Sequence, residues 1–176
     1  MNEQVLVIDD EQDAVDSIVE GLALQGISSR GDTSPQTAIE SFQASPTDVV
    51  IVDYVFPAST GVTGVDIIAQ LKAIKPFTKF ILISAWIDKD LDENTLTDEL
   101  RNKLQGHRYL PKPIDIDKLI ASVKEALEMT QTESSDWKSI AQQYVNQGAV
   151  NAEEVRQLNE KIKEHLIKAI DTKAEE

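Results

Sequence analysis

The chain has 176 residues, of which 41% are hydrophobic, so it can form one ordinary domain with a buried core and an appendage. Its formal net charge of −14 argues against direct binding to nucleic acid or to an anionic membrane surface, because such binding depends on Lys and Arg. The sequence has no apolar run long enough to span a membrane, no basic secretion signal, and no cysteine for a disulfide or a thiolate metal site. We therefore expect a cytoplasmic protein.

Short apolar runs alternate with stretches of helical spacing over the first 129 residues. The first of these helices carries periodic apolar residues from Ala14 until Gly26 ends the pattern. Ser34 followed by Pro35 is a favourable start for the second helix, and the third helix must stop before Pro76. The expected strands are residues 5–8, 27–30, 48–53, 78–84 and 108–110, and one helix follows each of them.

This alternation of strand and helix predicts an α/β fold. Parallel neighbours in a sheet need a crossover connection, so the pattern implies a parallel sheet with helices on both faces, although it leaves the strand order open. The segment 88–94 is too acidic for a core and leads into the fourth helix, which Gly106 closes. The fifth helix is expected to begin at a cap formed by Asp115 or Asp117.

The chain changes character after residue 129. Residues 130–135 carry no apolar side chain and are interpreted as a linker. Residues 136–176 are expected to form a helical extension, with one amphipathic helix near Trp137 and a second that starts at Asn151. Two such helices bury too little surface alone, so we expect them to pack against the preceding domain or to form a homodimer with a second copy of the chain.

Four of the predicted strands end in polar side chains. Four consecutive β-branched residues end at Asp53, after which the chain breaks into a loop with Pro and Gly. The first strand is followed by Asp9 and Asp10, and the fourth and fifth strands lead to Ser84 and Lys112. Because open α/β sheets bind ligands at the carboxyl ends of their strands, we expect these side chains to meet in one site.

The residue types at these strand ends suit phosphoryl transfer. Three carboxylates held close together repel one another unless a cation or a proton intervenes, and Mg²⁺ is a hard ion that takes oxygen ligands. Asp53 is expected to be ionised at neutral pH and to attack phosphorus as the nucleophile. Lys112 supplies a fixed positive charge, and Ser84 supplies a short hydroxyl that can reach a phosphoryl oxygen.

In this combination the sequence resembles the receiver domain of two-component response regulators, over about residues 4–129. The resemblance implies the flavodoxin-like strand order 2-1-3-4-5 and a receiver domain at residues 1–129. It also implies that Asp53 accepts a phosphoryl group from the phosphohistidine of a sensor histidine kinase or a phosphotransfer protein. The matching residues are Asp9-Asp10, Asp53 with Pro57, Ser84-Ala85 and Tyr109-Leu110-Pro111-Lys112-Pro113.

The resemblance also assigns a role to each residue of the site. Ser84 and Tyr109 would form a switch pair, and Lys112 would contact the phosphate. A cis peptide bond between Lys112 and Pro113 would match the family. The Mg²⁺ ligands would be Asp10, Asp53, the backbone carbonyl of Val55 and, through water, Asp9.

Two segments near the site depart from the family pattern. The loop 58–64 is longer by about three residues, and the stretch after the fourth strand is also longer, with the acidic run 88–99 as the insert. Val55 and Trp86 place apolar bulk two residues after the nucleophile and after the hydroxyl, where polar residues often guide the hydrolytic water. The apolar side chains of Val55 and Trp86 favour a long-lived phosphoryl group.

Two other classes of function remain as alternatives. A haloacid-dehalogenase-like phosphatase also uses Asp, Lys and Mg²⁺, but its nucleophile follows the first strand as Asp-x-Asp, whereas here that strand ends in adjacent Asp9 and Asp10. A phosphorylation-controlled transcription regulator would need a basic recognition helix, and residues 130–176 hold more acidic than basic side chains. We therefore expect a phosphoacceptor protein rather than an enzyme, which signals to an unidentified downstream protein through protein contacts.

Overall fold

The computed structural model describes residues 4–85 and 108–146, with side chains described as far as residue 132. The chain divides into two units, Met1–Thr130 and Gln131–Glu176. Several expectations from the sequence lie outside the described residues: the fourth helix with the acidic insert 88–99, Trp86, and the second helix of the extension.

The described part of the first unit is built on a parallel sheet with the strand order β2-β1-β3-β4-β5. This order confirms the flavodoxin-like α/β topology. The strands are β1 (Val5–Ile8), β2 (Ser29–Asp32), β3 (Val49–Asp53), β4 (Lys79–Ser84) and β5 (Arg108–Pro111).

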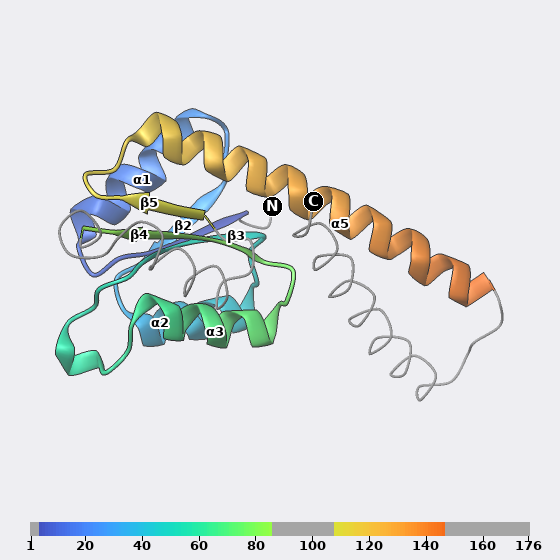
Figure 1. The fold of residues 1–176 in the computed structure, drawn as a ribbon, viewed down its shortest axis with the longest axis horizontal. Coiled ribbons are helices and arrows are strands. Elements are labelled where there is room, and N and C mark those ends of the chain that lie inside the picture. The colour runs from blue at the N-terminus through green and yellow to red at the C-terminus, as the bar shows by residue number, and fades with distance from the viewer. Residues whose placement is uncertain (1–3, 86–107, 147–176) are drawn as a thin grey trace, which may run out of the picture. The chain divides into compact units, whose positions relative to one another are not determined.

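Helices cover both faces of this sheet. Figure 1 shows α1 and the beginning of α5 on one face, and α2 and α3 on the other. The helices in the described residues are α1 (Gln12–Leu24), α2 (Pro35–Ala44), α3 (Gly64–Ile74) and α5 (Ile116–Asn146), with a short 3-10 turn, η1 (Ala58–Thr60).

Strand β3 contributes to the apolar cores on both faces of the sheet. Val49 and Ile51 pack in the core under α1 and α5, whereas Val50 and Val52 pack in the core under α2 and α3. The alternation follows from the two-residue period of a strand. Because all four side chains are fully buried, β3 is the centre of the domain, and Asp53 follows them at its carboxyl end.

The second strand begins later in the structure than the sequence predicted. Strand β2 begins at Ser29 rather than at Ile27, because Ile27 belongs to the C-terminal cap of α1. The Ile27 N–H donates to the Leu22 carbonyl at 3.0 Å, the Gly26 N–H donates to the Ala23 carbonyl at 2.9 Å, and Gly26 has a φ of 72°. This is a Schellman motif, in which the apolar Ile27 side chain packs back onto the helix end.

Two expected helix starts differ in how they are capped. Asp115 caps α5, because its carboxylate accepts the Lys118 N–H at 3.2 Å. Ser34 precedes Pro35 at the start of α2 as expected, yet its side chain makes no capping hydrogen bond.

The prediction of a linker at residues 130–135 was wrong, because α5 continues through this segment to Asn146. The polar composition of the segment reports the hydrophobicity of its side chains and not the conformation of its backbone. It contains neither Pro nor Gly, and Gln and Glu are good helix formers, so nothing in it ends a helix. The boundary between the two units nevertheless falls at Thr130, next to the expected end of the receiver domain.

None of the helices within the described residues has the length and apolar character needed to cross a membrane.

Candidate functional site

The carboxyl ends of four adjacent strands bring the predicted site residues to one edge of the sheet. Asp9 directly follows β1, Asp53 is the last residue of β3, Ser84 is the last residue of β4, and Lys112 directly follows β5. Asp10 extends the first of these ends by one residue. The parallel arrangement therefore brings these five positions to the same end of the sheet, as the sequence predicted.

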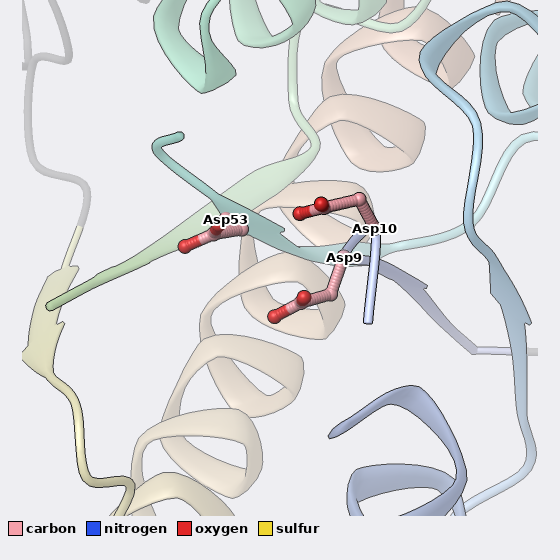
Figure 2. Close-up of side chains that lie close together, drawn as sticks. All are labelled: Asp9, Asp10 and Asp53. Carbon is pink, nitrogen blue, oxygen red and sulfur yellow. The ribbon is translucent and has the colours of Figure 1, made fainter. Parts of the chain in front are cut away.

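Three carboxylates converge at this edge. Asp9, Asp10 and Asp53 each present one oxygen, and these oxygens lie within 4.8 Å of one another. Figure 2 shows the three side chains together, with Asp9 and Asp10 beyond β1 and Asp53 beside them on β3. Asp9 is fully buried and Asp53 is 5% exposed, whereas Asp10 faces solvent. Solvent therefore reaches the cluster from the side of Asp10.

Lys112 lies between two of the carboxylates. Its Nζ atom is 2.8 Å from Asp9 Oδ2 and 3.4 Å from Asp53 Oδ1. The other oxygen of Asp9 accepts the Glu11 N–H at 3.0 Å, so this buried carboxylate is held on both sides. The peptide bond between Lys112 and Pro113 is cis, as the resemblance implied.

The electrostatics of the site are dominated by burial of Asp53. Burial raises the pKa of Asp53 to about 6, Lys112 opposes that rise, and the charge of Asp9 adds to it. Burial alone would lower the pKa of Lys112, but its hydrogen bond to Asp9 and the charge of Asp53 outweigh burial and raise it. The ammonium of Lys112 therefore does not offset the cost of burying the Asp53 carboxylate.

Ser84 and Tyr109 are linked on adjacent strands. The Tyr109 hydroxyl donates to the Ser84 carbonyl at 3.1 Å, and the half-buried ring packs against the core under α2 and α3. The same Ser84 carbonyl accepts the Lys112 N–H at 2.8 Å. A displacement of the Ser84 backbone would therefore reach both Tyr109 and the segment that carries Lys112.

The chain after Asp53 has a contact that the sequence reading missed. The Tyr54 carbonyl accepts the Gly64 N–H at 2.9 Å, which closes the loop 54–63 at its base. A signal was present in the sequence, since Thr63 and Asp66 form a capping box that fixes the start of α3 beside Gly64. Within the loop, Val55 is 40% exposed, and its carbonyl is two residues beyond the nucleophile candidate.

The donor atoms at this edge fit a hard divalent cation. All three clustered side chains offer carboxylate oxygens, and Mg²⁺ prefers oxygen ligands, often one or two carboxylates with water and phosphate completing the shell. The pKa of Asp53 is raised mainly by burial, so its ionised form gains from a cation that coordinates it directly. The cluster is therefore suited in chemistry and in charge to hold such an ion.

The residues of this site lie within a segment that matches a known protein family. The model of the response regulator receiver domain family matches residues 5–124. Among curated proteins, the chain is 30% identical over 124 residues to the DNA-binding transcriptional regulator NtrC of Azospirillum brasilense, which covers 70% of this chain and 24% of that protein. The chain thus spans about a quarter of the length of this relative.

Solved structures show the same fold. A response regulator receiver domain protein from Clostridium thermocellum is 26% identical with a TM-score of 0.60, and the alignment covers 73% of this chain and 97% of that one. An adenylate cyclase structure from Rhodopirellula baltica is 21% identical with a TM-score of 0.69, over 80% of this chain and 98% of that one. At that identity the second likeness is one of fold alone.

Proposed function

Because this chain belongs to the response regulator receiver domain family, and is thereby a signalling protein of two-component systems, we propose that it accepts a phosphoryl group on Asp53. The donor would be the phosphohistidine of a sensor histidine kinase or a phosphotransfer protein. The observation that carries this proposal is the convergence of Asp53 with Lys112 and two further carboxylates at the carboxyl edge of the sheet. The family match favours this function over the phosphatase alternative.

In the proposed reaction, a carboxylate oxygen of Asp53 forms a bond to phosphorus as the bond from phosphorus to the histidine nitrogen breaks. The leaving imidazole keeps the electron pair of the broken bond, and the product is an acyl phosphate on Asp53. With a pKa of about 6, Asp53 is mostly ionised at neutral pH and available as the nucleophile.

Lys112 is placed to balance the charge that accumulates during the transfer. Its Nζ atom already contacts an oxygen of Asp53 at 3.4 Å, so a phosphoryl group attached to that carboxylate would lie within reach of the ammonium. Lys112 keeps its proton at neutral pH because its pKa is raised. It therefore serves as a permanent positive charge rather than as an acid or a base.

We propose that Asp9, Asp10 and Asp53, with the backbone carbonyl of Val55, hold a Mg²⁺ ion. When bound, the ion would neutralise phosphoryl oxygens during transfer. Asp10 is exposed, and Lys112 contacts Asp53 at 3.4 Å but Asp9 at 2.8 Å, so Asp10 and Asp53 would bind the ion directly and Asp9 would act through water.

We also propose that Ser84 and Tyr109 report the phosphorylated state. A phosphoryl oxygen would attract the Ser84 hydroxyl, and the backbone of Ser84 is bonded to the Tyr109 hydroxyl. A shift of Ser84 would therefore break or bend that hydrogen bond and release the ring from its present position. The surface around Tyr109 would then differ between the two states and be read by a downstream protein.

Intact-mass spectrometry tests the central assignment. Wild type and Asp53→Asn are incubated with Mg²⁺ and acetyl phosphate, and the expected adduct of about 80 Da forms on the wild type only. Lys112→Met, which removes the ammonium while keeping an apolar stem, should form the adduct more slowly. A labile adduct of the same mass that persists on Asp53→Asn would contradict the proposal.

A further inference from the structure

The first turn of α3 contacts the backbone of the proposed phosphoacceptor. We propose that Gly64 is a positioning residue, because its lack of a side chain lets α3 close the loop 54–63 against Asp53 and Tyr54. The length and sequence of the exposed residues 57–61 then have little influence on the site. This inference rests on the proposed function of Asp53, and it concerns the part of the loop that departs from the family pattern.

The contact leaves no room for a side chain at Gly64. A Cβ atom on this residue would lie 2.1 Å from the carbonyl oxygen of Asp53 and 3.0 Å from its carbonyl carbon. It would also lie 3.0 Å from the Cα atom of Tyr54. All three are backbone atoms, which cannot rotate away as the end of a long side chain can, so any other residue would displace the chain at the end of β3.

Tyr54 is fixed from both sides by the same arrangement. Its N–H donates to the Ile83 carbonyl on β4 at 2.8 Å, and its carbonyl accepts the Gly64 N–H at 2.9 Å. Gly64 is the first residue of α3, where helical N–H groups lack partners within the helix, so this hydrogen bond costs the helix nothing. Asp53 and Val55 flank Tyr54, and both are proposed metal ligands.

The first turn of α3, which carries Gly64, is also held by hydrogen bonds. The Asp66 carboxylate accepts the Thr63 N–H at 2.8 Å, and the Thr63 hydroxyl accepts the Asp66 N–H at 3.4 Å. This capping box fixes the first turn of α3. Beyond it, residues 57–61 are exposed and η1 buries none of its side chains. The loop therefore extends into solvent from a base that is held by Tyr54 and Gly64.

The test compares two alanine substitutions in the same loop region. In Gly64→Ala the new methyl group meets the Asp53 carbonyl, whereas in Gly61→Ala it meets no atom within 4 Å. Gly61 has a φ of 66°, so its substitution carries backbone strain but no collision with the site. Mg²⁺ affinity is measured by calorimetry, and stability by denaturation, for both variants of the full chain.

We expect Gly64→Ala to weaken Mg²⁺ binding by roughly tenfold or more, as displaced supporting groups do at other metal sites, while Gly61→Ala stays within about twofold of wild type. A folded Gly64→Ala protein with wild-type affinity would overturn the inference. A third variant lacks residues 58–60 and should also bind Mg²⁺ within about twofold of wild type. If Gly64→Ala does not fold, the variant that lacks residues 58–60 tests the inference. A roughly tenfold loss of Mg²⁺ affinity in that variant would show that the loop does influence the site and would refute the inference.

Amide chemical shifts of Asp53 and Tyr54 in metal-free protein distinguish this inference from the proposed function. Shifts that change in Gly64→Ala, and stay unchanged in Gly61→Ala, support the contact even if the wild type binds no Mg²⁺, a result that would contradict the proposed metal site alone. Unchanged shifts in Gly64→Ala would overturn the inference whatever the metal affinity.

Discussion

Replacement of Asp53 by Asn should stabilise the metal-free protein. Asp53 is 5% exposed and lies next to Asp9 and Asp10, so its ionised form is unfavourable in the folded state. Asn keeps the size of the side chain and removes its charge. The variant that abolishes the proposed phosphorylation is therefore expected to be the more stable protein in the absence of a cation, which a purely structural role for Asp53 would not produce.

The magnitude follows from the pKa of Asp53, which rises from 3.8 to about 6 on folding. Below the unfolded value the carboxyl is protonated in both states and adds no penalty. As the pH rises from the unfolded value to the folded value, the penalty on the folded state grows by about 1.4 kcal/mol per pKa unit, and above the folded value it stays constant. The penalty on wild type is then about 3 kcal/mol near pH 8 and about half of that near pH 5.

Urea denaturation followed by circular dichroism measures this difference. Wild type and Asp53→Asn are compared in EDTA, and Asn is expected to gain about 2–3 kcal/mol near pH 8 and about half as much near pH 5. Asp10→Asn is the matched control, since it neutralises an exposed carboxylate of the same cluster and should gain less. Saturating Mg²⁺ should remove the advantage, because the ion binds only the folded wild type tightly.

Two outcomes would refute this reasoning. One is an Asp53→Asn protein that is less stable than wild type near pH 8 in EDTA. The other is a stability gain that does not change with pH, which would mean that the gain comes from packing and not from charge.

Further predictions concern the metal, the phosphoryl group, the switch and the extension. Asp10→Ala should weaken Mg²⁺ binding in a calorimetric titration, and an unchanged affinity would contradict the proposed coordination. Replacing Val55 by Asn should shorten the lifetime of the phosphoryl group, measured as decay of the mass adduct, whereas an equal lifetime would mean that Val55 does not shield it. Tyr109→Phe removes the hydrogen bond to Ser84 and should cost about 1 kcal/mol of stability in the unphosphorylated protein without lowering the adduct yield. Sedimentation of the full chain and of residues 1–129, each with and without a beryllofluoride mimic, tests the expected homodimer, which a full-length monomer in both states would exclude.

The sequence predicted the central part of the fold well because burial leaves a strong pattern there. The β-branched run 49–52 is buried on both faces, and its continuous apolar character indicated a central strand. The edge strand β2 was placed two residues too early, because Ile27 is apolar for a different reason: it caps α1. Local propensity does not distinguish an apolar cap residue from the first residue of a strand.

The end of the receiver domain was a harder problem. A polar stretch at residues 130–135 was interpreted as a linker, but hydrophobic periodicity reports side-chain burial and not backbone conformation. A helix keeps its backbone hydrogen bonds through a segment that has no apolar face. Only a helix-breaking residue in the segment would have indicated an end.

The convergence of the side chains at the site was predictable, whereas backbone contacts around it were not. Asp9, Asp10, Asp53 and Lys112 meet as expected because parallel strands end at the same edge. The close approach of Gly64 to the Asp53 carbonyl depends on the angle at which α3 leaves its loop, which no residue type encodes by itself.

The alternating contribution of β3 to two cores has a consequence for the evolution of the chain. Val49 and Ile51 face one core and Val50 and Val52 face the other, so inserting or deleting a single residue within the strand would exchange the two sets and turn Asp53 to the opposite face. Changes of length in this protein can therefore accumulate in loops but not in β3, where only pairs of residues preserve the parity of the strand. Insertions in relatives should accordingly be found on either side of this strand, and any change in the number of residues from Val49 to Asp53 should be an even number.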